Sequence, residues 1–179
     1  MSRTSRGLHY ASGWRASLKE SGGPLLETHS HELDYLISLL GEPESVFAQG
    51  LNLNGWGDYV DSMFVQVKFR TGGIGLLYGS NATPIGDYSV HIQCGNGNIV
   101  HGGFGGELKY QSFTDEKPTV IQKADLDHLP NPYDHELTSF FDWIEKDTPP
   151  LFTGETGRAN VAIADAAYLS IETGGSITL

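Results

Sequence analysis

The sequence has 179 residues, a length that allows one well-buried core, and its composition marks neither a second hydrophobic unit nor a long linker. Its 22 acidic residues against 11 lysines and arginines give a formal net charge of -11, which argues against nucleic acid or an anionic membrane as a partner. Cys94 is the only cysteine, so an intramolecular disulfide and a thiolate metal cluster are excluded. No stretch approaches the roughly 18 apolar residues of a membrane-spanning helix, and we expect a soluble, cytoplasmic protein.

The first predicted helix follows a Gly-Gly-Pro turn at residues 22–24. Its apolar residues recur at helical spacing: Leu33, Leu36, Ile37 and Leu40. Thr28 or Ser30 is expected to cap its start, and Gly41 with Pro43 is expected to end it. The apolar face of this helix needs a partner, which we expect the following strands to supply.

The middle of the chain is predicted to be rich in strands. They are expected at residues 44–53, 62–70, 74–78, 89–94, 98–101, 107–113 and 119–122. The second of these alternates apolar and polar residues, which predicts one buried face carrying Met63, Val65, Val67 and Phe69. Glycines at residues 72–73 and 95–97 predict short turns between strands. Short turns favour antiparallel neighbours, because parallel strands need crossovers of about a dozen residues or more.

Two helices are predicted at the end of the chain. The first starts near Asp134 and places four large apolar residues on one face: Leu137, Phe140, Phe141 and Ile144. The second, at about residues 155–172, is rich in alanine and ends at Gly174. The element order predicts an α+β fold in which an open, largely antiparallel sheet has its helices packed on one face. The uncovered face is expected to pair with another copy of the chain, which predicts a homo-oligomer.

Acid–base residues gather at the entrance of the first helix. Glu27 and His31 stand four residues apart, so on one continuous helix the carboxylate would orient the imidazole and raise its basicity. His29 and His31, with Glu27 or Asp34, also offer a set of zinc ligands. Residues two apart diverge on a helix, so the pattern favours acid–base chemistry over a metal site.

Two groups of residues, one near each end of the chain, occur in the same order as in a known protein family. The first is GGPLLE at 22–27, His31, DYL at 34–36, GEP at 41–43 and Val46. The second is HEL at 135–137, Phe140, WI at 143–144, Pro150, TGE at 153–155, Gly157, Ser170 and TG at 173–174. Together they resemble the C-terminal domain of the glucose-fructose oxidoreductase and inositol dehydrogenase (Gfo/Idh/MocA) family. The resemblance runs from about Trp14 to Leu179.

The resemblance implies a two-domain enzyme of which this chain is the second half. Members join an N-terminal Rossmann domain, which binds NAD or NADP, to a dihydrodipicolinate-reductase-like domain that holds a sugar or polyol and mediates oligomerisation. We therefore expect a lead-in segment at residues 1–20 and a substrate-binding and oligomerisation domain at residues 21–179. No glycine-rich strand-turn-helix fingerprint opens the chain, so we expect it to contain no cofactor-binding residues and not to transfer hydride alone.

The resemblance also assigns roles. His31 takes the place of the acid–base residue that accepts the proton of a substrate hydroxyl as hydride leaves for the nicotinamide, and Glu27 replaces the family's aspartate. A lysine from a Glu-Lys-Pro triplet in the Rossmann domain completes the family's site. The triplet at residues 116–118 lies downstream of His31 and is predicted to be a surface turn.

Three further residues are expected to contact substrate: His29, Tyr78 and Asn81. His29 stands where the family often has a glycine, while an aromatic face and an amide suit a polyol. Strand packing explains Tyr78 and Asn81 equally well. The predicted function is the substrate-binding and oligomerisation half of an NAD(P)-dependent sugar or polyol oxidoreductase. The alternatives are a noncatalytic carbohydrate-binding or assembly module and, third, a metal-dependent enzyme that uses His29 and His31.

Overall fold

The computed structural model describes residues 1–7, 12–103, 106–150 and 152–179. They form two compact units, the first made of Met1–Ser89 with Thr156–Leu179 and the second of Val90–Glu155. The hydrogen-bonded strand order is β8-β7-β6-β5-β1-β4-β3-β2-β9, and β5 passes from one unit into the other. This is the α+β fold with an open, largely antiparallel sheet that the sequence predicts.

The described residues of the first unit form six strand segments. Their bounds are β1 Ser2–Arg6, β2 Pro43–Leu51, β3 Ser62–Phe69, β4 Ile74–Ser80, the start of β5 Ala82–Cys94, and β9 Ile177–Thr178. All neighbours are antiparallel except β1 and β4, which are parallel and align Arg3 with Gly79. The predicted alternation in β3 is confirmed: the four apolar residues expected on its buried face are at most 1% exposed, while Phe64 on the other face is 64% exposed.

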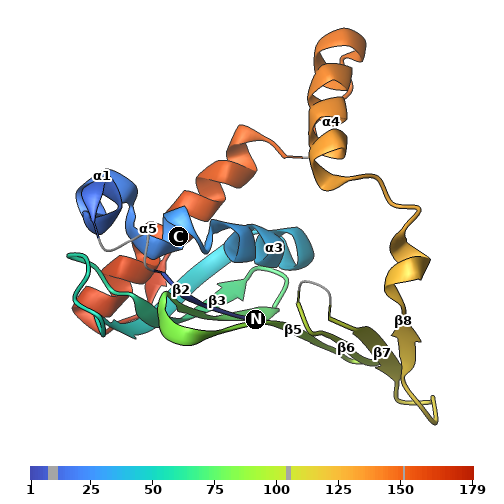
Figure 1. The fold of residues 1–179 in the computed structure, drawn as a ribbon, viewed down its shortest axis with the longest axis horizontal. Helices are drawn as coiled ribbons and strands as arrows, with labels where there is room; N and C mark the ends of the chain where they lie inside the picture. The colour runs from blue at the N-terminus through green and yellow to red at the C-terminus, as the bar shows by residue number, and fades with distance from the viewer. Residues whose placement is uncertain (8–11, 104–105, 151) are drawn as a thin grey trace. The chain divides into compact units, whose positions relative to one another are not determined.

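Helices cover one face of this sheet (Figure 1). They are α2 Gly23–Glu27, α3 Ser30–Leu40 and α5 Gly154–Thr173, whose residues from Thr156 on belong to the first unit. The short 3-10 helix η2 Gly13–Ala16 and helix α1 Leu18–Ser21 precede them and bury no residue. The core joins Leu25 of α2, Leu33 of α3 and Ile163 of α5 to the inward side chains of β2, β3 and β4. Burying these apolar side chains against each other is the main term that stabilises the unit.

One prediction of local structure is wrong, and one strand was missed. The residue that precedes α3 is His29, and no side chain caps this helix start, so the cap expected from Thr28 or Ser30 is wrong. Strand β1 was not predicted because its sequence, Ser-Arg-Thr-Ser-Arg, lacks apolar alternation. The predicted end of α3 is confirmed, since Gly41 has a φ of +86° that favours glycine.

The second unit is a meander followed by a helix. Its elements are the end of β5, β6 Gly97–His101, β7 Leu108–Ser112, β8 Thr119–Ile121, the 3-10 helix η3 Lys123–Leu126 and α4 Pro132–Lys146. The predicted tight hairpin is confirmed by the pairing of Cys94 with Gly97, and residues 116–118 form an exposed turn between β7 and β8. The predicted apolar side chains of α4 are between 51 and 64% exposed. In the described part of the chain, no helix combines the length and hydropathy required to cross a bilayer.

Candidate functional site

The segment that carries Glu27 and His31 is a junction between two helices. Gly22 and Gly23 both have positive φ, and a Cβ on Gly23 would collide with the hydroxyl of Tyr168, so both positions favour glycine. α2 ends at Glu27, Thr28 and His29 lie outside regular helix, and α3 begins at Ser30. Glu27 and His31 therefore do not share one continuous helix, which was the condition for their expected contact.

Glu27 is held by an arginine. The Nε of Arg15 donates to Oε1 of Glu27 at 2.7 Å, with both side chains half-buried. The Arg15 guanidinium also lies 4.3 Å from the centre of the Trp14 ring, a cation–π distance. In the described part of the structure the carboxylate of Glu27 thus bonds to Arg15 and not to His31.

His31 lies in the first turn of α3 with an exposed side chain. No hydrogen bond or ion pair to it occurs among the described residues. Tyr35, 40% exposed, follows one turn later, and residues four apart share a face of a helix. The imidazole is therefore open to a molecule that approaches this face of α3, and it can accept or release a proton there.

His29, by contrast, points into the protein. Its side chain is 0% exposed, and neither ring nitrogen makes a hydrogen bond in the described structure. Its ring packs directly on Gly79 of β4, where a Cβ would lie 2.8 to 3.0 Å from three ring atoms. The Nδ1 atom lies 3.5 Å from Oε2 of Glu32, an ion-pair distance when the histidine is protonated.

The other two predicted substrate contacts lie on different sides of the sheet. Asn81 is 2% exposed; its Oδ1 accepts from Ser5 at 3.0 Å, and its Nδ2 donates to the hydroxyl of Thr28 at 3.4 Å. Tyr78 stacks on Phe64 at 4.6 Å, on the outer face of β3 and β4. The structure therefore brings His29 and Asn81 together beneath the junction and keeps Tyr78 apart from them.

Two residues at this site were missed from the sequence. Arg3 of β1 donates from Nη1 to the backbone oxygen of Thr28 and to Oε1 of Glu32, both at 3.0 Å. Glu32 is 1% exposed. Burial raises the pKa of its carboxyl, but His29 and Arg3 together lower it further than that, so the pKa lies below its usual value. Glu32 could have been identified from the sequence, because its carboxylate lies in the same helical stripe as the apolar residues Leu33 and Leu36.

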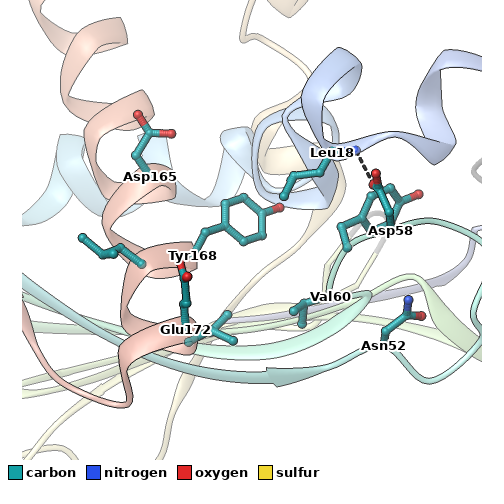
Figure 2. A pocket seen from close by; sticks show the side chains of 10 residues that line it. Leu18, Asn52, Asp58, Val60, Asp165, Tyr168 and Glu172 are labelled. Carbon is teal, nitrogen blue, oxygen red and sulfur yellow. Dashed lines mark hydrogen bonds between the residues drawn. The ribbon is translucent and has the colours of Figure 1, made fainter.

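A cavity of about 560 Å³ is lined by residues of α1, of α5 and of the connection between β2 and β3 (Figure 2). Tyr168 extends into it from α5, and its hydroxyl accepts from the backbone N–H of Leu25 at 3.3 Å. Burial raises the pKa of Tyr168 well above its usual range. The pKa of Tyr59 is raised by burial and then by Asp61 and Asp58.

Three carboxylates also line this cavity: Asp58, Asp165 and Glu172. Carboxylates accept hydrogen bonds from hydroxyl groups and repel phosphates. The lining is therefore compatible with a neutral polyhydroxylated molecule.

The described residues do not form a dinucleotide site. None of the described strands leads through a glycine-rich turn into a helix that could hold a pyrophosphate. Nor do the described residues contain a group of three or more His, Cys, Asp or Glu side chains placed to hold a metal ion.

Comparison with known proteins finds a family model and a relative that match this chain. Residues 2–179 match a family model described as "oxidoreductase family, C-terminal alpha/beta domain". The chain is 35% identical over 91 residues to the 2,7-anhydro-N-acetylneuraminate hydratase of Escherichia coli K12, covering 48% of this chain and 24% of that enzyme.

Solved structures show the same fold at lower identity. A protein of Desulfitobacterium hafniense described as an NADPH-dependent oxidoreductase is similar with a TM-score of 0.84 and 21% identity, covering 99% of this chain and 55% of that one. The WlbA dehydrogenase of Bordetella pertussis, solved with NADH and UDP-GlcNAcA, is similar with a TM-score of 0.75 and 22% identity over 99% and 53% of the two chains. This chain therefore spans about half the length of these structures.

Proposed function

This chain belongs to the Gfo/Idh/MocA oxidoreductase family as a C-terminal alpha/beta domain, and on that premise we propose that it is the substrate-binding half of an NAD(P)-dependent sugar or polyol oxidoreductase. The family match across residues 2–179 is the observation that carries the proposal. A sugar-derived substrate is supported by the UDP-GlcNAcA in WlbA and by the name of the E. coli hydratase. A nicotinamide is supported by the NADH in WlbA.

In this proposal His31 is the proton acceptor. Oxidation of a CH–OH group removes the hydroxyl proton, and an exposed imidazole at the start of α3 can take it. Glu27, fixed by Arg15, lies at the end of the preceding helix and supplies negative charge at the same junction. The oxidation also needs a hydride acceptor, which the described residues do not hold. A dinucleotide-binding domain, on the same polypeptide or another, must therefore complete the enzyme.

The substrate contacts predicted for His29, Tyr78 and Asn81 stay predictions. We further propose that the outer face of the first unit's sheet joins copies of the chain. Three large apolar residues stand exposed there: Phe64, Ile74 and Leu76, between 58 and 64% exposed. The predicted cytoplasmic location also stays a prediction.

The activity is tested with the protein combined with its dinucleotide-binding domain. NAD(P)H formation is followed over a panel of sugars and polyols. On a compound of the panel that the enzyme oxidises, His31→Ala should lower kcat at least about 100-fold, because positioned acid–base groups contribute at least that much to the rate. Glu27→Gln should lower it as well. The control is His91→Ala, which changes another exposed histidine, on β5 in the second unit, and should leave kcat unchanged. Full activity of His31→Ala would refute the assignment.

A noncatalytic carbohydrate-binding module is the second candidate. The observation that favours it is the bond between Glu27 and Arg15, which leaves His31 without a carboxylate partner among the described residues. Such a module would bind a sugar from the same panel in calorimetry but form no NAD(P)H. A module that serves assembly alone would bind none of them.

A further inference from the structure

A partly buried ion pair joins the first strand to the junction between α2 and α3. Arg3 is the second residue of β1, and its Nη1 atom donates to the backbone oxygen of Thr28 and to the carboxylate of Glu32. These partners are 25 and 29 residues away in the sequence. One guanidinium therefore ties three elements together: β1, the end of α2 and the first turn of α3.

The sheet beneath the junction is shaped for this arrangement. Arg3 is aligned with Gly79 on the parallel neighbour β4. Because Gly79 has no side chain, the ring of His29 can pack directly against the strand at the position aligned with Arg3. Asn81, one residue beyond the end of β4, donates to the hydroxyl of Thr28. The junction is thus held at its backbone, at the side chain of Thr28 and at His29.

The buried carboxylate of Glu32 needs a positively charged partner, and Arg3 provides it. A carboxylate that is 1% exposed is costly unless it is paired and hydrogen-bonded. Arg3 supplies the paired charge, while His29 presents Nδ1 from the other side at 3.5 Å. Since Glu32 directly follows His31, and Thr28 directly follows Glu27, the bonds of Arg3 fall one residue beyond each proposed catalytic group.

We infer that Arg3 and Glu32 are positioning residues, which fix the α2–α3 junction and thereby the relative placement of Glu27 and His31. Neither residue contacts the reacting atoms in this scheme. The catalytic benefit of this arrangement rests on the proposed function. The stabilisation of the junction by the ion pair does not, and it can be tested without any substrate.

The test is amide hydrogen exchange on the chain and its Glu32→Gln variant. In the structure the amides of Thr28 and His29 donate to the oxygen of Pro24, and that of Leu33 donates to the oxygen of His29. Loss of the ion pair should speed exchange at these three amides about tenfold or more, while the amides of β3 stay within about twofold. Glu32→Asp, which keeps the charge, should restore part of the protection.

The matched control is Glu42→Gln. It removes an exposed ion pair of the same kind, in which Arg70 Nε lies 3.0 Å from Glu42 Oε1, and should leave exchange at the junction unchanged. Unchanged exchange at the junction in Glu32→Gln would overturn the inference, as would acceleration spread evenly over β3. These outcomes are independent of His31→Ala, whose effect on activity tests the proposed function.

The values of kcat and KM distinguish a positioning role of Glu32 from a general effect on stability. On the sugar or polyol found by the oxidation panel, Glu32→Gln should lower kcat about tenfold and leave KM within about twofold, because it displaces the proton acceptor and removes no substrate contact. A change in KM alone would overturn the positioning role.

Discussion

At the scale of single residues, the site depends on which of two neighbouring histidines faces solvent. His31 is exposed, while His29 is fully buried against Gly79 and Glu32. His29 lies in the junction just before α3, where its ring packs on Gly79 of β4, while His31 lies in the first turn of the helix with its side chain exposed. His31 is therefore accessible to a substrate, while His29 packs between the junction and the sheet.

Glu32 should make the stability of the protein depend on pH. Its pKa is lower in the folded chain than the ordinary value of 4.5, so its stabilising effect is present above pH 4.5 and is lost as the pH falls through the folded value. We expect Glu32→Gln to lower the free energy of unfolding by about 1 to 2 kcal/mol at neutral pH, less than for a fully buried pair because Arg3 is 27% exposed. Urea unfolding measures the difference. It should shrink when both proteins are compared at about pH 3; a difference independent of pH would contradict this account.

At the scale of elements, the site depends on the close approach of α3 to the sheet. The helix buries Leu33 and Leu36 in the core, and its N-terminal end rests on β4 through His29 and Gly79. Only a residue without a side chain permits that contact, because a Cβ at position 79 would lie within 3.0 Å of the ring. The helix start is thus placed by a glycine on another element.

Gly79→Ala should therefore destabilise the protein by about 2 kcal/mol, as overpacking of a well-filled site does. Gly95→Ala is the control, since a Cβ there meets nothing within 4 Å, and should change stability by less than about 0.5 kcal/mol. The melting temperatures of both variants measure the effect. His29→Ala in the Gly79→Ala background should recover part of the loss, because the clash is between these two residues. Additive effects of the two substitutions would show that the contact is not the cause.

At the scale of the whole molecule, the described structure exposes large apolar surfaces. The outer face of the first unit's sheet carries the stacked pair Phe64 and Tyr78, with Leu76 beside them around a hollow of about 340 Å³. Contiguous apolar surface of this kind is typical of an interface between proteins. A second copy of the chain is the occupant that we propose for it.

Phe64→Glu should consequently reduce the molecular mass in solution, measured by size-exclusion chromatography with light scattering, from that of an oligomer to that of one chain. A charge buried in an apolar interface without a partner is strongly unfavourable. Leu39→Glu on α3, 48% exposed and on an element that covers the other face of the sheet, should leave the mass unchanged. A wild-type protein that is already monomeric would refute the proposed interface.

Local patterns in the sequence were enough to predict most elements and the family. The alternation in β3, the apolar stripe of α3 and the glycine turn of the β5–β6 hairpin depend on residues close together in the chain, and each is confirmed. The family resemblance is confirmed by the match over residues 2–179. Periodicity and turn chemistry are local properties, so one sequence carries them in full.

The composition of the site was decided by the tertiary structure. The placement of β1 between β4 and β5, the bonds from Arg3 to Thr28 and Glu32, and the packing of His29 on Gly79 join residues that lie far apart in the sequence. The same holds for Tyr78, whose face depends on the register of β4 against β3. Burial, and the pKa shift of Glu32 that follows from it, exist only once these distant segments have packed together.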